Sequence, residues 1–342
     1  MTTTVTMQVA PDERVADALP RLDGVGAVVD GDGRFLGTIT DAAVRRRLLE
    51  AEDPSDVRCG EVLDVEPVTV LPDASDDDVR ALLSARHVRT AAVVDGARFV
   101  GPTTVDAPTP PATAIALAGG KGERLQPLTF KVPKPLLQVG GRSILERTLE
   151  AVRASGIEDV WLAVNYMADM IEERIGDGSR YGLRVQYLRE EQPLNTAGPL
   201  TLLPDEPPGP VVVANTDQIT NMSFARMVDY HLAEQADVTV AAHLYEVAVP
   251  YGVFELHGTE LVGVREKPVV RYPINAGYYV VDPGVIALVP RGESFGMPDL
   301  MHAVMSGGGR VVVFPMVETW IDIGTPEALE QALLLFATGE EV

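Results

Sequence analysis

Mainly apolar runs alternate with amphipathic stretches along the last two thirds of the chain. Four runs have the length of a buried strand: TAIALA (113–118), DVWLAV (159–164), GPVVVAN (209–215) and DVTVAA (237–242). Between the first two, residues 144–152 carry apolar side chains at helical spacing, with a Ser143–Glu146 capping box before them and Gly156 after them. Such alternation predicts an α/β fold with a mainly parallel sheet covered on both faces.

The first hundred residues contain one pattern twice. APDERVADALPRL and AVVDGDGRFLG return as LPDASDDDVRALLSA and AAVVDGARFVG. The matched Pro11 and Pro72 lie 61 residues apart, and the matched Gly37 and Gly101 lie 64 apart, so one supersecondary unit is used twice. Each copy predicts a strand, a helix and two strands joined at Asp-Gly. We expect a small α+β domain over residues 1–106.

This repeated unit resembles a CBS domain pair. Such pairs often bind adenine nucleotides through a Thr or Ser followed three residues later by Asp. Here Thr40 is followed at that spacing by Ala43, while Thr103 and Asp106 match it one residue out of register. The second copy also runs directly into a Pro-rich segment, so its closing helix is expected to be missing. A structural or dimerising role is therefore favoured over nucleotide sensing.

The Pro-rich segment 107–112 is expected to link this unit to a larger domain over residues 113–342, because proline interrupts helices and central strands. The chain's formal charge of -22, from 50 acids and 28 bases, argues against nucleic acid or anionic lipid as a partner. No apolar run approaches the roughly 20 residues that span a bilayer, and no secretory signal is recognisable. A cytoplasmic protein is predicted. The single cysteine, Cys59, allows no internal disulfide.

The candidate chemistry begins in LAGGKGERLQPLTFKVPKPLL, residues 117–137, directly after a buried-type strand. Glycines at such a strand end let backbone N–H groups approach phosphate oxygens. The order of residues is not that of a P-loop, and Leu125 stands where a dinucleotide fingerprint has its third glycine. Arg124 and Lys134 place two cations in the same loop of an acidic chain. A phosphate ligand is therefore predicted here.

The pattern G-G-x-G-x-R-L-x-P-L-T followed by P-K-P resembles the signature of the sugar-phosphate nucleotidyltransferase family, from about residue 112 to 337. The resemblance implies a Rossmann-like, GT-A-like sheet and transfer of a nucleoside monophosphate from an NTP to a sugar 1-phosphate, with release of pyrophosphate. Glu123 replaces the family's usual Thr or Ser. By resemblance Arg124 and Lys134 hold the triphosphate. The nucleotide-binding positions it implies are Leu117, Ala118, Gly119, Gly120, Gly122, Arg124, Thr196, Ala197 and Gly198.

Two later segments resemble the family's metal-binding positions. VVVANTDQI resembles a strand ending in Asn-Gly-Asp, with Thr216 in place of the glycine and Asp217 kept, and WIDIGTPEAL supplies Asp322. The resemblance assigns Mg²⁺ as cofactor to these two carboxylates, and such hard oxygen ligands suit that ion. EQPLNTAGPL resembles the turn near the base, with Asn195 in place of its first glycine, which leaves the base open.

YGVFEL, REKP and NAGYYV resemble the segments that form the sugar side of the family's site. Glu266 would accept hydrogen bonds from sugar hydroxyls, and Lys267 would meet the sugar phosphate. The implied sugar-phosphate positions are Tyr251, Gly252, Glu266, Lys267, Asn275, Gly277 and Arg291. The implied catalytic set is Arg124, Lys134, Asp217, Lys267 and Asp322.

Two other functions remain open. One is a catalytically silent regulatory or assembly subunit, in which the fold serves only association. Against it, the chain keeps both metal-binding carboxylates and all the phosphate-binding cations that the resemblance implies. A glycosyltransferase typically holds its metal with an Asp-x-Asp pair, which the candidate metal residues do not form. The pairing of a CBS-like unit with this catalytic segment favours GTP, while the sugar stays open. A homo-oligomer is expected, with the CBS-like unit as its candidate interface.

Overall fold

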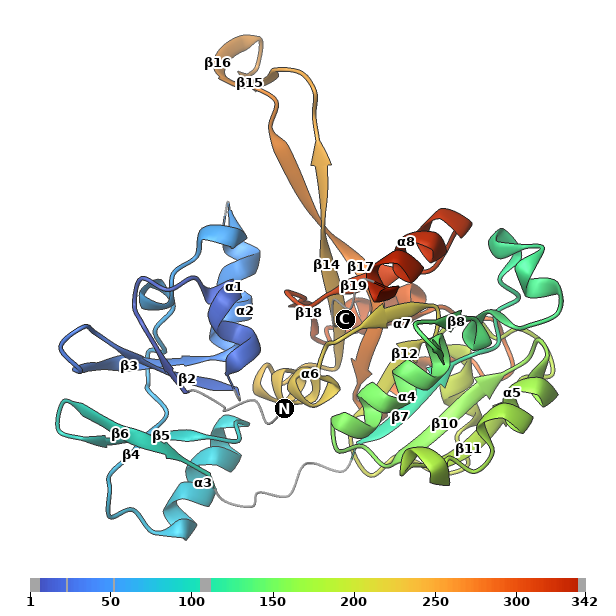
Figure 1. Ribbon diagram of the computed structural model, residues 1–342, viewed down its shortest axis with the longest axis horizontal. Coiled ribbons are helices and arrows are strands. Elements are labelled where there is room, and N and C mark those ends of the chain that lie inside the picture. Colours follow the sequence, from blue (N-terminus) through green and yellow to red (C-terminus); the bar gives the residue numbers. More distant parts are fainter. Residues whose placement is uncertain (1–6, 23, 52, 105–111, 338–342) are drawn as a thin grey trace.

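The computed structural model describes residues 7–22, 24–51, 53–104 and 112–337. Figure 1 shows two small sheets from the N-terminal part beside one large sheet with its helices, and a long two-stranded ribbon that projects from the large sheet. Within the described residues, no helix combines the length and the apolar character needed to cross a bilayer. Asp106 and residues 107–111 of the predicted linker lie outside the described residues.

The N-terminal unit confirms the predicted repeat. Its two three-stranded sheets have the orders β1-β2-β3 and β4-β5-β6, and in each the first pair is parallel and the second antiparallel. The strands are β1 (Gln8–Val9), β2 (Val25–Val29), β3 (Phe35–Thr40), β4 (Thr69–Val70), β5 (Ala91–Asp95) and β6 (Arg98–Thr103). The α-helices are α1 (Val15–Ala18), α2 (Asp41–Glu50) and α3 (Asp76–Arg86). Helix α2 closes the first copy, and the second copy has no counterpart within the described residues.

The seven-stranded sheet has the order β11-β10-β7-β12-β17-β14-β18. Its strands are β7 (Thr113–Leu117), β10 (Asp159–Val164), β11 (Arg184–Arg189), β12 (Val211–Asn215), β14 (Val238–Ala248), β17 (Val269–Val281) and β18 (Val311–Pro315). Only β17 runs antiparallel to its neighbours among these seven described strands. The predicted mainly parallel sheet is therefore confirmed, and the four apolar runs lie in β7, β10, β12 and β14.

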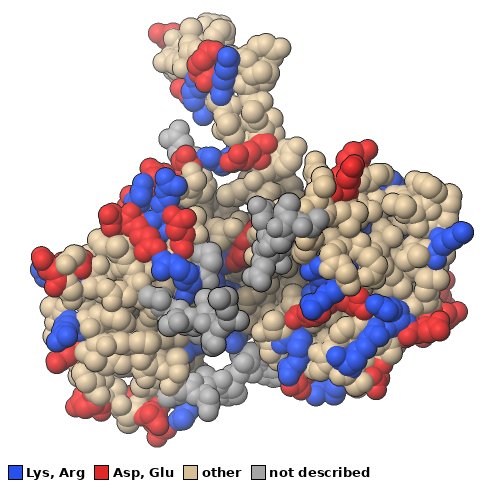
Figure 2. Space-filling view, viewed as in Figure 1, with Lys and Arg blue, Asp and Glu red and all other residues tan. Residues whose placement is uncertain are grey.

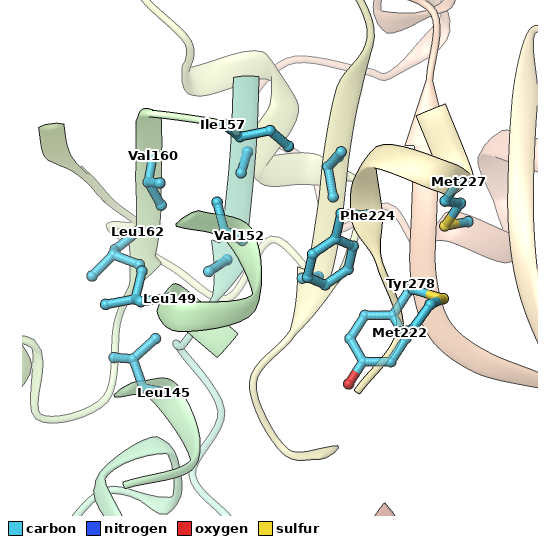
Figure 3. Packing of buried hydrophobic residues seen from close by; sticks show 14 of the residues in the cluster. Leu145, Leu149, Val152, Ile157, Val160, Leu162, Met222, Phe224, Met227 and Tyr278 are labelled. Carbon is cyan, nitrogen blue, oxygen red and sulfur yellow. The ribbon is translucent and has the colours of Figure 1, made fainter. Parts of the chain in front are cut away.

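Helices cover both faces of this sheet. They are α4 (Ile144–Ala154), α5 (Ala168–Ile175), α6 (Phe224–Ala233) and α7 (Met297–Ser306). Helix α8 (Pro326–Ala337) instead buries Leu329 in a separate cluster with Val139 and Ile219. On one face, Leu149 of α4 packs near Leu162 of β10, and Phe224 of α6 meets Tyr278 of β17 edge to face with ring centroids 5.6 Å apart (Figure 3). The other face buries Met297 of α7. Because successive strand side chains point to opposite faces, a strand covered on both sides must be apolar throughout.

Short sheets and 3-10 helices complete the larger part. The short strand pairs are β8 (Gln138–Val139) with β9 (Arg142–Ser143), β13 (Gln218–Thr220) with β19 (Trp320–Asp322), and β15 (Val253–His257) with β16 (Glu260–Arg265). The predicted capping box is confirmed: the Ser143 side chain accepts from the Glu146 N–H, and Glu146 accepts from the Ser143 N–H. Thr325 caps α8 as predicted, accepting from the Ala328 N–H.

A buried arginine joins the N-terminal unit to the large sheet. Arg45 of α2 is fully buried, and its guanidinium donates to Asp41 and Glu318 carboxylate oxygens at 2.7 Å each and to the Pro315 carbonyl at 2.5 Å. It also stacks on Phe314, with Cζ 3.7 Å from the ring centre. Burial opposes ionisation of Glu318, but the Arg45 charge outweighs it and lowers the pKa of this carboxyl. The two parts are therefore held together by a desolvated ion-pair network.

Candidate active site

The predicted glycine loop borders two cavities at the carboxyl ends of β7 and β12. One, of about 490 Å³, is lined by the loop residues 119–125 together with Lys134 and Asp217. The other, of about 260 Å³, lies between Gly120, Lys134 and Asp217 on one side and Thr196 on the other. Ligands of open α/β sheets bind at this edge, outside the carboxyl ends of the strands. The location predicted from the sequence is therefore a real concavity.

The glycines bring backbone to the cavity because side chains do not fit. Gly122 has a φ of +61°, and a Cβ built there would lie 2.9 Å from Lys134 Cβ and 2.9 Å from Thr129 Cγ2. A Cβ at Gly119 would lie 3.0 Å from Glu190 Oε1. Thr129 holds the loop by donating its hydroxyl hydrogen to the Gly122 carbonyl at 2.9 Å. The loop is thus shaped for close approach of a ligand to its main chain.

Asp217 and Asp322 meet although 105 positions separate them in the sequence. Antiparallel pairing of β13 with β19 sets Gln218 opposite Asp322, and the Ile323 N–H donates to the Asp217 carbonyl at 2.9 Å. Burial and the negative charge of Asp217 raise the pKa of the Asp322 carboxyl, against the opposing charges of Lys134 and Arg124. The two carboxylates therefore share one electrostatic environment.

Arg124 and Lys134 of the loop lie beside these carboxylates. Lys134 is almost buried, and its Nζ donates to Asp217 Oδ2 at 2.8 Å. A Cβ built at Gly324 would lie 3.2 Å from Arg124 Nη2 and 2.9 Å from Asp322 Oδ2, so Arg124 stands beside the second carboxylate. The structure therefore brings together four of the five residues in the implied catalytic set.

The carboxylate pair fits a magnesium ion. Asp217 Oδ1 is buried and has no hydrogen-bond partner in the structure. A buried carboxylate oxygen without a partner is costly, and a bound cation would compensate its charge. Within the described residues, no group of three or more His, Cys, Asp or Glu side chains is placed to hold a metal. Mg²⁺ suits such a site, because it is usually held by one or two carboxylates, substrate phosphates and water.

The turn expected near the base keeps its backbone shape. Asn195 has a φ of +66°, in the left-handed region that glycine favours and asparagine tolerates. Thr196 accepts from the Met297 N–H through its hydroxyl at 2.8 Å, while the N–H groups of Ala197 and Gly198 donate to the Phe295 carbonyl. Replacing the family's glycine by Asn195 therefore leaves this turn in a conformation that a glycine would adopt.

The remaining nucleotide-side and sugar-side positions divide into two groups. Leu117 ends β7 and Ala118 follows it. A Cβ on Gly277 would lie 2.5 Å from Asn215 Nδ2 at the end of β12, and Asn275 accepts from the Gly277 N–H at 2.9 Å. Arg291 is exposed in the loop that follows a 3-10 helix, next to Gly292, whose carbonyl accepts from Gln192 at 2.7 Å. Leu117 and the Asn215 neighbour of Gly277 line the smaller cavity, whereas Arg291 lies outside both.

Four predicted sugar-side residues are not brought to the glycine loop. Tyr251, Gly252, Glu266 and Lys267 gather near the tip of the projecting ribbon, where the Lys267 N–H donates to the Tyr251 carbonyl at 3.2 Å (Figure 1). In this structure these four residues are therefore not among those that line the two cavities at the glycine loop, and their role on the sugar side stays a prediction. The physical reason is that β14 and β17 stay paired beyond the sheet and carry their connection away from it.

Sequence reasoning missed two polar residues of the cavities. Asn165 follows β10 and borders the larger of the two cavities, while Glu190 follows β11 and borders the smaller. Burial raises the pKa of Glu190, which accepts from the Leu194 N–H at 2.7 Å. Each is the first residue after a parallel strand, so the rule that led to the glycine loop would have found both.

A third cavity, of about 590 Å³, lies away from the glycine loop, between the N-terminal unit and α6. Thr40, the residue weighed as a ribose ligand, borders it. Its hydroxyl accepts from the Ala43 N–H and donates to Asp64 Oδ1, so it is engaged in capping α2. The volume of a cavity does not identify the candidate active site here, because the clustered carboxylates and cations lie in the two smaller cavities.

Comparison with known proteins identifies families for both parts of the chain. The family model described as nucleotidyl transferase matches residues 113–338, and the CBS domain model matches residues 1–50. The chain is 34% identical over 222 residues to the mannose-1-phosphate guanylyltransferase catalytic subunit beta of Xenopus tropicalis, covering 63% of this chain and 61% of the relative. It is 33% identical over the same shares to the mannose-1-phosphate guanylyltransferase of Mycobacterium tuberculosis. The chain thus spans about three fifths of these relatives' length.

Two solved structures share the fold at low identity. A putative glucose-1-phosphate thymidylyltransferase from Bacillus anthracis has a TM-score of 0.53 and 23% identity, over 66% of this chain and 95% of that one. HddC from Yersinia pseudotuberculosis, complexed with GMP-PN, has a TM-score of 0.51 and 22% identity, over 66% of this chain and 99% of that one. At this identity the likeness concerns the fold alone.

Proposed function

The chain belongs to the nucleotidyl transferase family and carries a CBS domain, and on that premise we propose that it transfers GMP from GTP to a hexose 1-phosphate in the cytoplasm. The products are a GDP-sugar and pyrophosphate. The relatives named as mannose-1-phosphate guanylyltransferases support GTP as the donor and make mannose 1-phosphate the first acceptor to test.

The observation that carries this proposal is the pairing of Asp217 with Asp322 beside Lys134 and Arg124, at the glycine loop. Joining a triphosphate to a phosphate brings two polyanions together, so the barrier is largely electrostatic and orientational. The site supplies two cations, a glycine main chain that a ligand can approach closely, and a partly buried carboxylate pair suited to Mg²⁺. These are the groups that such a reaction requires.

The reaction needs no covalent nucleophile. An ionised oxygen of the sugar phosphate attacks the α-phosphorus of GTP, the new P–O bond forms, and the bond to the bridging α–β oxygen breaks with its electron pair on pyrophosphate. We assign Arg124 and Lys134 to the charge of the triphosphate, with Asp217 orienting the Lys134 ammonium. Held by Asp217 and Asp322, Mg²⁺ would neutralise charge on the α-phosphate and polarise it.

We assign the base side to the turn with Thr196, Ala197 and Gly198, and the sugar side to Asn275, Gly277 and Arg291. Glu266 and Lys267 are assigned to the sugar hydroxyls and the acceptor phosphate, as the family resemblance implies. Both residues lie on the ribbon, so this assignment requires the ribbon to reach a glycine-loop site.

We propose residues 1–106 as the CBS-like unit, 107–112 as the linker and 113–342 as the catalytic domain. The matched ranges of the two family models and the separate sheets support this division. The buried Arg45 network supports a structural role for the N-terminal unit, because it ties that unit to the segment that leads into β19 and Asp322.

Pyrophosphate release tests the reaction directly. Purified protein is incubated with Mg²⁺, each common nucleoside triphosphate and a panel of hexose 1-phosphates, beside an Asp217→Asn control. Release that requires GTP and one sugar phosphate, and that is lost in the control, is the expected result. Folded protein that stays silent across the panel would instead support the regulatory-subunit function.

A further inference from the structure

The ribbon, defined as residues 243–274, exposes far more apolar surface than its size explains. Of the 23 large hydrophobic side chains that are exposed among the described residues, ten belong to the ribbon. Near its tip, Phe254 is 63% exposed, Leu256 61% and Val262 61%. Figure 2 shows this projection as mostly uncharged surface. Contiguous exposed apolar surface of this kind marks an interaction site.

The base of the ribbon carries an ion pair on one face and a tyrosine pair on the other, and these are named the polar and the apolar face, although the exposed Val269 also lies on the polar one. Glu246 lies opposite Arg271 on the first face, whereas Tyr245 lies opposite Tyr272 on the second, each of the two tyrosines 53% exposed. On the polar face Arg271 donates to Glu246 at 2.8 Å and to Asp53 of the N-terminal unit at 3.0 Å. Exposed ion pairs contribute about 1 kcal/mol at most, so this contact orients the ribbon but holds it only weakly. The contact lies on the polar face, and the apolar face stays uncovered.

The backbone of the ribbon is equally open. Strand β18 pairs with β14 only through Ala242, and β12 pairs with β17 only from Tyr278 onward. Within the described residues, the outer edges of the ribbon beyond these points have no strand beside them. A solitary two-stranded ribbon is marginally stable in water, and open edges invite pairing with another chain.

The ribbon also carries Lys267 away from its own site. Eight residues separate Lys267 from Asn275, and at about 3.3 Å per residue they span roughly 25 Å. The ribbon leaves the sheet at the same edge as the glycine loop, because Asn275 and Gly277 stand beside β12. In this direction it overshoots its own cavity, and its tip is presented outward (Figure 1).

Resting on the function proposed above, we propose that two copies of this chain exchange their ribbons, so that Lys267 of each copy enters the glycine-loop site of the other. Each site then holds Asp217, Asp322, Arg124 and Lys134 from one copy and Glu266 with Lys267 from its partner. The arrangement is symmetric: the same ribbon surfaces meet across a two-fold axis, as in closed dimers.

A second copy fits the ribbon better than a different partner. The ribbon has four acids and three bases within a chain of formal charge -22, so a strongly basic protein would be drawn to the rest of the surface instead. The ten exposed side chains are divided between the two faces of the ribbon, so exchange that inserts the ribbon into the other copy can cover both faces. If each side chain then loses on the order of 100 Å², two ribbons bury about 2,000 Å², which is at the upper end of the standard interface range. Every copy, moreover, presents a phosphate-binding site to receive Lys267.

Mixed dimers test the exchange. Asp217→Asn inactivates a site but leaves its ribbon intact, and Lys267→Ala does the reverse. The two variants carry different affinity tags, are produced together, and the heterodimer is isolated through both tags. Exchange combines one intact site with one intact ribbon, so the heterodimer should show about half of the wild-type pyrophosphate release. A ribbon that serves its own site would give none, and that result would overturn the proposal.

A cross-linking measurement keeps the test independent of the reaction. Cys59 is buried, so thiols placed at Lys121→Cys on the glycine loop and Tyr251→Cys on the ribbon can be joined selectively by a bis-maleimide. Exchange predicts a covalent dimer on a denaturing gel that neither single variant forms. Cross-linking within one chain, or none, would refute exchange. A covalent dimer of the double-cysteine variant, together with wild-type protein that releases no pyrophosphate, would refute the proposed reaction alone.

Discussion

Replacing the buried Arg45 by methionine is expected to weaken the junction between the N-terminal unit and the large sheet. The change keeps a long apolar side chain against Phe314 but removes the charge that neutralises Asp41 and Glu318, whose side chains are 11% and 13% exposed. Removing one partner of a buried ion pair costs about 3–5 kcal/mol, because a carboxylate is left desolvated and uncompensated. We expect Arg45→Met to lose about 3 kcal/mol of unfolding free energy.

Urea unfolding followed by tryptophan fluorescence measures this loss. Trp320 lies two positions after Glu318 and stacks on His243, so it reports on this region, and a Trp161→Phe background removes the only other tryptophan signal. Arg46→Met is the matched control, since Arg46 forms an ion pair with Glu234 while its own side chain is 58% exposed. Such a pair contributes at most about 1 kcal/mol. Equal losses for the two variants would refute the reasoning.

The penalty should also depend on pH. The folded-state pKa of Glu318 lies below its ordinary value of 4.5, so the pair contributes stability that is present above pH 4.5 and is lost as pH falls through the folded pKa. In Arg45→Met the same carboxyl is buried without its partner, which raises its pKa. The difference between wild type and variant should therefore be largest near neutral pH and shrink in acid. A penalty independent of pH would mean that packing alone is lost.

The remaining predictions concern the glycine-loop site. Asp217→Asn should lower pyrophosphate release about 100-fold or more at unchanged far-UV circular dichroism, since metal coordination supplies several kcal/mol to such reactions. Gly122→Ala should cost about 1–3 kcal/mol and raise the KM for the triphosphate, because a Cβ at φ +61° would meet Lys134 at 2.9 Å. The raised pKa of Asp322 means that, without metal, stability falls as pH rises from 3.8 through that pKa, so the thermal stabilisation by Mg²⁺ should grow over the same window.

Each of these has a control in the chain. Gly120→Ala places a Cβ with no atom within 4 Å, so it should change stability far less than Gly122→Ala, and equal effects would contradict the steric explanation. Asp322→Asn should abolish the pH dependence of the Mg²⁺ effect, and an unchanged dependence would assign it to another group. Full pyrophosphate release by Asp217→Asn in chelator-treated buffer would show that the reaction does not depend on a metal held by this carboxylate.

Local sequence patterns determined most of the fold. Strand runs, the Ser143 capping box and the duplicated N-terminal unit could all be predicted, because each depends on hydrophobic periodicity or on contacts between residues three or four apart. The glycine loop was predictable for the same reason, since a strand end, the glycines and the cations Arg124 and Lys134 stand within 18 residues of each other, from Leu117 to Lys134.

The tertiary structure alone decided how distant segments meet. Asp217 and Asp322 became neighbours through the β13–β19 pairing, and Arg45 found Glu318 across 273 positions. Neither contact follows from spacing, because strand pairing and domain docking depend on surfaces formed by the whole chain. The same holds for Lys267: its motif is local, but its position follows from how far β14 and β17 remain paired beyond the sheet. Sequence thus predicted the chemical groups, and only the packed fold decided which of them share a site.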